Sequence, residues 1–137
     1  MGVFIGDSKN TSAARSALQI NYLVLKVVNE KIKEVYPNTS YQVKHAVGID
    51  TSDLFIARTG IRGSNDLVWV GRAANYAAKL CSLRESTYNS YITEDVYNLL
   101  SDELKFGGDP RRNMWEKYMW ITMGITVYRS SWWWKPD

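Results

Sequence analysis

The segment GRAANYAAKL, residues 71–80, contains side chains of the kinds that bind anions. Asn75 and Lys79 stand four positions apart, a spacing that brings two side chains onto the same face of a helix. They follow the apolar run LVWV, so a strand ending at Gly71 is expected to place them near the start of a helix. Arg72 adds positive charge at the same helix start. The segment therefore predicts a site for an anionic group.

Other candidate residues have simpler structural interpretations. Asn75 and Lys79 themselves have an alternative one, as ordinary solvated positions on a helix surface. His45, the single histidine, falls on the apolar face of a predicted strand, which favours a core or interface position over a catalytic base. Cys81 lies among leucines, where a small buried hydrophobe is expected. Turn chemistry explains the aspartates that lie near predicted turns. These are Asp50, Asp53 and Asp66.

The composition indicates one globular domain, which we predict to span residues 1–137. Hydrophobic residues make up 45% of the chain and charged residues 23%, as in proteins that bury a core. The net charge of +3 is spread along the chain rather than gathered in blocks, so no nucleic-acid partner is predicted. The chain has one cysteine, and it shows neither a secretory leader pattern nor an apolar run of about 18 residues. These features predict a cytoplasmic protein without a membrane partner.

Apolar periodicity predicts the elements that would position residues 71–80. MGVFIG predicts a strand over residues 1–6, and apolar residues at helical spacing then predict one long helix that Pro37 ends. Alternation over 41–50 predicts a second strand. Residues 54–59 and 67–70 predict a hairpin with a glycine-containing turn.

The second half of the chain completes the predicted fold. We expect a helix over 71–83, a short strand leading into a helix capped by Thr93, and a last strand over 119–128. This order favours an α+β domain of ferredoxin-like kind, with an antiparallel or mixed sheet and helices on one face. An aromatic tail follows at 130–137, and its tryptophans are expected to pack on the core or to meet a partner. The aromatic residues expected to pack in this region are Trp115, Tyr118, Trp120, Trp132, Trp133 and Trp134.

Several short motifs, in a fixed order, resemble those of the class III adenylyl and guanylyl cyclases. VGIDTSDLFIARTGIRGSNDLVWVGRAANYAAKLCSL resembles the family's G-I-H-x-G strand, hairpin, and G-x-x-x-N-x-x-x-R helix start. MGVF resembles the family's M-A-V-F strand, and YITEDVYNLL resembles I-x-x-S/T-E-x-x-Y. The resemblance covers the chain up to about residue 105. The matching residues are Gly48, Ile49, Gly71, Asn75 and Lys79, with the turn over residues 60–65 between them.

The resemblance implies an enzyme that joins the 3′-oxygen of a nucleoside triphosphate to its α-phosphorus and releases pyrophosphate, with two Mg²⁺ or Mn²⁺ ions. It implies that Asn75 orients the ribose and that Lys79, in place of the family's arginine, stabilises the phosphate. Gly71 and Arg72 are expected to contribute to substrate binding.

Val68 occupies the position from which the purine cyclases read the base, three residues before Gly71, and valine cannot hydrogen-bond a purine edge. The resemblance is therefore to bacterial pyrimidine cyclases, which make cyclic CMP or cyclic UMP in antiphage signalling, and it implies CTP or UTP as substrate. The alternatives are an adenylyl cyclase, a catalytically dead cyclase-like regulatory domain, and an RNA-binding module.

The resemblance also predicts what this chain lacks. The family's two metal-binding aspartates would lie upstream of Met1, and Asp7 falls on the wrong side of the MGVF strand to replace either. We therefore expect an N-terminally incomplete domain that lacks its first strand, holds no metal ligand and is inactive alone. Because the family's sites form between two subunits, the resemblance implies a homodimer with shared sites.

Overall fold

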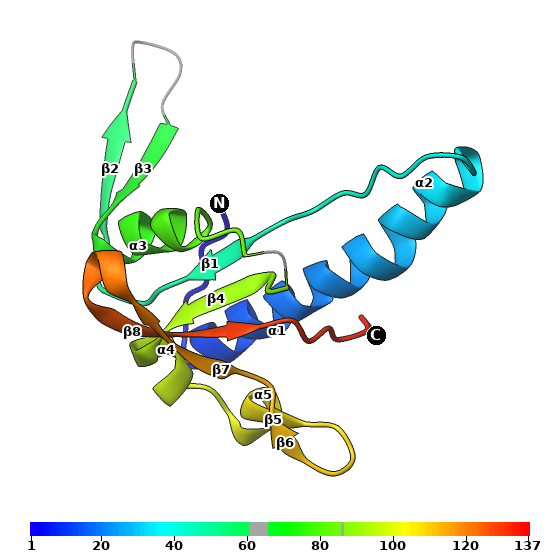
Figure 1. Ribbon diagram of the computed structural model, residues 1–137. Helices are drawn as coiled ribbons and strands as arrows, with labels where there is room; N and C mark the ends of the chain where they lie inside the picture. The colour runs from blue at the N-terminus through cyan, green and yellow to red at the C-terminus, as the bar shows by residue number, and fades with distance from the viewer. Residues whose placement is uncertain (61–65, 86) are drawn as a thin grey trace.

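A computed structural model describes residues 1–60, 66–85 and 87–137 and has a four-stranded sheet at its centre (Figure 1). The strands lie in the order β1-β4-β8-β7. β1 pairs with β4 in parallel, and the other two pairs are antiparallel, so the expected mixed sheet is confirmed. The bounds are β1 Val47–Ile49, β4 Ser90–Thr93, β7 Glu116–Trp120 and β8 Ile125–Ser130.

Helices cover both faces of this sheet rather than one. Tyr91 and Ile92 are neighbours in β4, so their side chains point to opposite faces. Tyr91 packs with Leu80 of α3 (Arg72–Leu80), whereas Ile92 packs with Leu18 of α1 (Lys9–Leu23). The prediction that the helices share one face is therefore wrong, because adjacent residues of β4 are both buried and apolar, so each face of the sheet is covered by its own helix.

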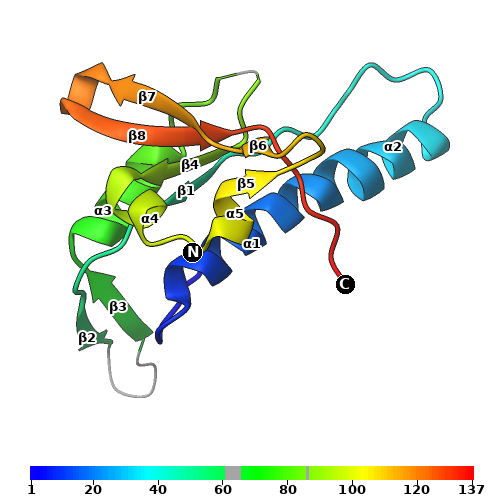
Figure 2. The same cartoon turned by 90° about the horizontal axis from the view of Figure 1, so that it is seen from below.

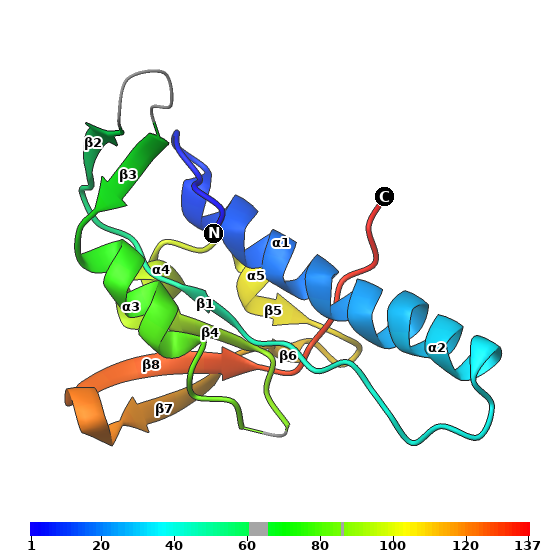
Figure 3. The same cartoon turned by 90° about the horizontal axis from the view of Figure 1, so that it is seen from above.

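The predicted long helix is confirmed as one continuous helical segment (Figure 3). It comprises α1, a π-helical segment at Val24–Val28, and α2 at Asn29–Val35. Ala14 and Leu18 of α1 are fully buried against the sheet, but the apolar residues of the second half, such as Leu25 and Val35, are exposed. Two hydrogen bonds join the segment that returns from α2 to β1 back to α2. Asn29 Nδ2 donates to Val43 O at 3.1 Å, and Val43 N–H donates to Asn29 Oδ1 at 2.7 Å.

Three strand predictions need correction. Residues 1–6 form no strand and are exposed, because no strand among the described residues lies beside them to share backbone hydrogen bonds. The strand expected over 41–50 is reduced to β1, and Tyr41 is exposed. The single strand expected over 119–128 is a hairpin of β7 and β8, joined by a 3-10 turn at Ile121–Met123 and by Gly124, whose φ of +64° favours glycine.

The predicted hairpin after β1 is confirmed, and it forms a separate two-stranded sheet. β2 (Phe55–Thr59) and β3 (Asp66–Val70) are antiparallel, with Phe55 opposite Val70. The hairpin extends away from the main sheet (Figure 1), and all five residues of β2 are exposed. Of the turn predicted at 60–65, residues 61–65 lie outside the described residues.

The C-terminal tail lies across α1 (Figure 2). Asn21, fully buried in α1, donates from Nδ2 to Ser131 O and Trp132 O, at 3.1 and 2.9 Å. Trp134 N–H donates to Leu18 O at 3.1 Å, and Trp132 and Trp134 pack against the core cluster. The tail tryptophans are thus mainly packing residues, as expected, although Trp133 is half exposed beside Tyr22. The remaining elements are α4 Glu94–Asn98, α5 Asp102–Lys105, β5 Phe106–Gly107 and β6 Arg112–Asn113.

Candidate functional site

The helix α3 carries three of the predicted site residues, and the structure confirms that it begins directly after β3 and Gly71. Gly71 precedes its first residue, Arg72. The Ser52 hydroxyl, from the loop after β1, accepts a hydrogen bond from Ala73 N–H at 3.0 Å. This bond satisfies one of the free donors in the first turn of the helix, a role that the sequence does not assign to Ser52.

Close packing between α3 and β1 fixes the position of the helix. A Cβ atom at Gly48 would overlap Ala77 O and would lie 2.7 Å from Leu80 Cβ. Gly48 N–H also donates to Cys81 Sγ at 3.1 Å, so Cys81 is half buried and hydrogen-bonded rather than a simple apolar filler. The glycine of the G-I motif thus lets the helix lie directly on the strand.

Gly71 has a comparable packing role. A Cβ atom there would lie 2.7 Å from Leu54 Cδ2 and 3.0 Å from Asp53 O. Its backbone is extended, so the requirement for glycine comes from space rather than from conformation. Val68 lies opposite Ala57 in the exposed hairpin, on the strand that leads into Gly71.

Arg72, Asn75 and Lys79 lie on one face of α3. Their spacing of three and four residues places them in a row, with all three exposed, while Ala73 and Leu80 on the other face are buried. Lys79 Nζ lies 3.9 Å from Met123 Sδ at the tip of the β7–β8 hairpin. The structure therefore brings the predicted amide and two cations together on an open surface.

Arg72 is bound to two carboxylates. Its Nη2 donates to Asp95 Oδ2 at 2.6 Å and to Thr51 O at 2.9 Å, and its Nε lies 3.4 Å from Asp50 Oδ2. The hydrogen bond to Asp95 and the charge of Asp50 raise the pKa of the Arg72 guanidinium. The cluster therefore joins one guanidinium to two carboxylates.

The Asp50 side chain is fully buried, a position that the turn role predicted from the sequence does not require. It is 0% exposed, and Oδ1 accepts a hydrogen bond from Thr93 Oγ1 at 2.6 Å. The Thr93 hydroxyl therefore does not cap α4, although Thr93 occupies the N-cap position. Asp50 and Thr93 become a pair only because β1 and β4 are adjacent, which no local sequence pattern reveals. One feature of the sequence could have drawn attention to Asp50: it stands where the G-I-H motif has histidine.

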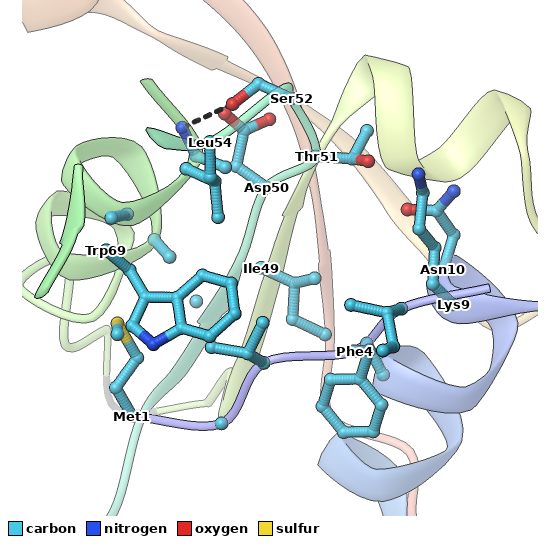
Figure 4. A pocket seen from close by; sticks show the side chains of 18 of the residues that line it. Met1, Phe4, Lys9, Asn10, Ile49, Asp50, Thr51, Ser52, Leu54 and Trp69 are labelled. Carbon is cyan, nitrogen blue, oxygen red and sulfur yellow. Dashed lines mark hydrogen bonds between the residues drawn. The ribbon is translucent and has the colours of Figure 1, made fainter. Parts of the chain in front are cut away.

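A cavity of about 480 Å³ (Figure 4) is lined by the α3 residues Ala73, Ala74 and Ala77, which lie on another face of the helix from the polar row. It is enclosed by residues 1–6, α1, β1 and the buried face of α3, with Trp69 and Met1 at one end and Asn10 at the other. Asp50 lines it, but none of the five predicted site residues does. The polar face of α3 and this apolar cavity are therefore two separate surfaces.

His45 is half buried, and burial lowers its pKa, which disfavours the charged form. Within the described ranges, no three His, Cys, Asp or Glu side chains lie together as a metal site would require.

Among the helices that the structure describes, none combines the length and apolarity of a membrane span.

Comparison with known proteins identifies relatives along the full length of the chain. No model of a protein family matches it. It is 52% identical to a uridylate cyclase from Xanthomonas perforans, over 100% of this chain and 58% of that protein. A uridylate cyclase from Burkholderia cepacia is also 52% identical, over 98% of this chain and 56% of that protein. The corresponding protein from Rhodovulum sp. is 41% identical over 99% of this chain and 59% of its own length. The chain thus spans less than two thirds of these relatives.

The fold is also found in a solved structure. The crystal structure of a guanylyl cyclase superposes on 93% of this chain and 61% of its own, with a TM-score of 0.62 and 13% sequence identity. This likeness shows a shared fold.

Proposed function

The chain belongs to the class III nucleotidyl cyclases, and from this premise we propose that the protein containing it converts UTP to 3′,5′-cyclic UMP and pyrophosphate. The observation that carries this proposal is 52% identity over the full chain to a protein named uridylate cyclase. The exposed row of Arg72, Asn75 and Lys79 supports it, because such a row suits a ribose and a chain of phosphates.

The proposed reaction exchanges one phosphorus–oxygen bond for another. The ribose 3′-oxygen attacks the α-phosphorus and forms the new bond, its proton passes to solvent water, and the bond from that phosphorus to the bridging oxygen of pyrophosphate breaks, so that pyrophosphate leaves with the bonding electrons. Asn75 would hydrogen-bond the ribose and hold the 3′-oxygen in line. Lys79 would stabilise the negative charge of the phosphoryl group as it transfers.

The base preference is proposed from the relatives and from Val68. An apolar side chain at this position supplies no hydrogen bond to a purine edge, which is consistent with a pyrimidine. UTP is preferred to CTP because the relatives above are named uridylate cyclases. The expected use of the cyclic product in antiphage signalling rests on the family resemblance and stays a prediction.

We also propose that two Mg²⁺ or Mn²⁺ ions take part, held by aspartates outside this chain. The described residues form no cluster that fits such ions, so we derive no catalytic step through them. When bound, the ions would lower the pKa of the ribose hydroxyl and bind the phosphates.

The function is tested with the full-length protein, meaning this chain together with the part that its relatives contain and it does not span. Incubated with Mn²⁺ and each of ATP, GTP, CTP and UTP, it is expected to form cyclic UMP from UTP, detected by mass spectrometry. This chain alone is expected to form none. A cyclic purine product would instead support an adenylyl or guanylyl cyclase, and no product from any substrate would support the regulatory domain.

The homodimer is a further part of this proposal, and the β2–β3 hairpin is the surface that supports it. A two-stranded sheet is marginally stable alone in water. The hairpin nevertheless exposes large apolar side chains that no described part of this chain covers, and a second copy would bury them. These side chains are Phe55, Ile56, Leu67, Val68 and Val70.

Phe55→Asp is expected to weaken this dimer, with cyclase activity falling at low protein concentration. Phe55 is 82% exposed, so the charge disturbs no core of its own chain but would be buried in an interface. Sedimentation velocity should show at least about a tenfold rise in the dimer dissociation constant. Ile121→Asp is the matched control, because Ile121 is 85% exposed and lies on the other hairpin. Equal dimerisation of the wild type and Phe55→Asp would contradict this interface.

A further inference from the structure

The two carboxylates that bind Arg72 differ in a way that suggests different roles. Asp50 contacts the Nε edge of the guanidinium and has a fully buried side chain. Asp95 contacts Nη2 and has a side chain that is 57% exposed. Arg72 itself is 47% exposed, at the first turn of α3 and in the same row as Asn75 and Lys79.

Asp50 has the properties of a fixed anchor. It is joined to the sheet by the 2.6 Å hydrogen bond from Thr93 Oγ1. Its other oxygen, Oδ2, is buried and has no hydrogen-bond donor among the described residues, and the nearby cation is Arg72. Removing Arg72 from a buried carboxylate would leave an uncompensated charge, so this contact is costly to break.

Asp95 has the properties of a replaceable partner. Ion pairs between exposed side chains contribute little to stability, because water screens both charges. A phosphate oxygen offers the same hydrogen-bond acceptor as a carboxylate oxygen, with more negative charge for the guanidinium. A phosphate group that reaches Nη2 of Arg72 can therefore take the place of Asp95 there.

We propose that Asp50 is a positioning residue that fixes the guanidinium of Arg72, and that Asp95 is a counter-ion displaced by a phosphate of the substrate. The identity of the substrate as UTP rests on the proposed function, but displacement by a polyphosphate does not. Asp95 would thus compete with the substrate, and Asp50 would support its binding.

The same chemical change at the two aspartates therefore has opposite expected effects. The test titrates the 137-residue chain with inorganic tripolyphosphate and follows binding by calorimetry and by the NMR signal of the Arg72 Nε–H group. Asp95→Asn is expected to strengthen binding about threefold, because an exposed competitor is lost. Asp50→Asn is expected to weaken binding at least about fivefold and to broaden the Nε–H signal, because the anchor is lost.

Glu94→Gln is the matched control for net charge. Glu94 neighbours Asp95 in the first turn of α4, and its carboxylate lies 3.6 Å from Lys117 Nζ. The variant removes the same charge as Asp95→Asn and should leave tripolyphosphate binding unchanged. If Asp50→Asn does not fold, Thr93→Val removes the hydroxyl that holds Asp50 and tests the same anchor.

Three results would overturn the proposal. The first is that tripolyphosphate does not shift the NMR signal of Arg72. The second is that Asp95→Asn binds tripolyphosphate more weakly than the wild type. The third is that Glu94→Gln gains as much affinity for tripolyphosphate as Asp95→Asn does. Failure of the proposed function is a different result, because tripolyphosphate would then bind this chain as expected while the full-length protein forms no cyclic UMP.

Discussion

Asn75→Ala in the full-length protein should lower kcat for the proposed formation of cyclic UMP by about 10²–10³-fold, the loss typical of a donor that acts mainly in the transition state. Asn75 is exposed on α3 and packs in no core cluster, so its truncation should leave the fold unchanged. The expected loss is therefore chemical, because the ribose 3′-oxygen would no longer be held in line with the α-phosphorus. Steady-state kinetics with UTP measure it, with the thermal midpoint as the check on folding.

Asn98→Ala is the matched control for Asn75→Ala. Asn98 is an exposed asparagine on a helix, α4, outside the row of polar residues on α3. The same truncation there should leave kcat within about twofold of the wild type. Equal activity of Asn75→Ala and the wild type would exclude the assigned role and leave Asn75 as an ordinary surface residue.

Gly48→Ala should destabilise this chain by about 3 kcal/mol, the upper part of the range for an overpacked core site. The added methyl would overlap Ala77 O and would lie 2.7 Å from Leu80 Cβ, in contacts made by a helix backbone and a fully buried leucine. Neither can move without shifting α3 from β1. Urea denaturation followed by tryptophan fluorescence measures the loss as a lower midpoint.

Gly2→Ala is the control for this substitution. A Cβ at Gly2 would lie 3.5 Å from Phe4 Cε2, an ordinary van der Waals distance, so the urea midpoint should not change. In the full-length protein Gly48→Ala should also reduce cyclase activity, because Asn75 and Lys79 move with α3. An unchanged midpoint in Gly48→Ala would mean that α3 does not lie on β1 as described.

Much of the site's local framework follows from short-range patterns. Glycine after an apolar run predicted the start of α3, and helical spacing predicted that Asn75 and Lys79 share a face. The hairpin and the long helix were predicted for the same reason, since alternation and 3.6-residue periodicity describe single elements. The roles of these residues in substrate binding stay predictions.

The errors lie where an element depends on a distant partner. Residues 1–6 have a strand-like sequence, but a strand forms only where another strand receives its hydrogen bonds. Residues 119–128 are mostly apolar, so their pattern did not reveal the turn that Gly124 closes. The sequence likewise did not predict that both faces of β4 are covered, because two adjacent apolar residues in a short strand do not indicate which helix packs on which face.

By itself, the sequence determined the order of the main elements, the exposed row on α3 and the resemblance to nucleotide cyclases, because each depends on residues close together in the chain. The tertiary structure alone decided that Asp50 is buried beside Thr93 and that Arg72 lies between Asp50 and Asp95. Asp50 directly follows β1, and the others lie in β4, α3 and α4. Burial and ion pairing arise only when such separate elements pack together.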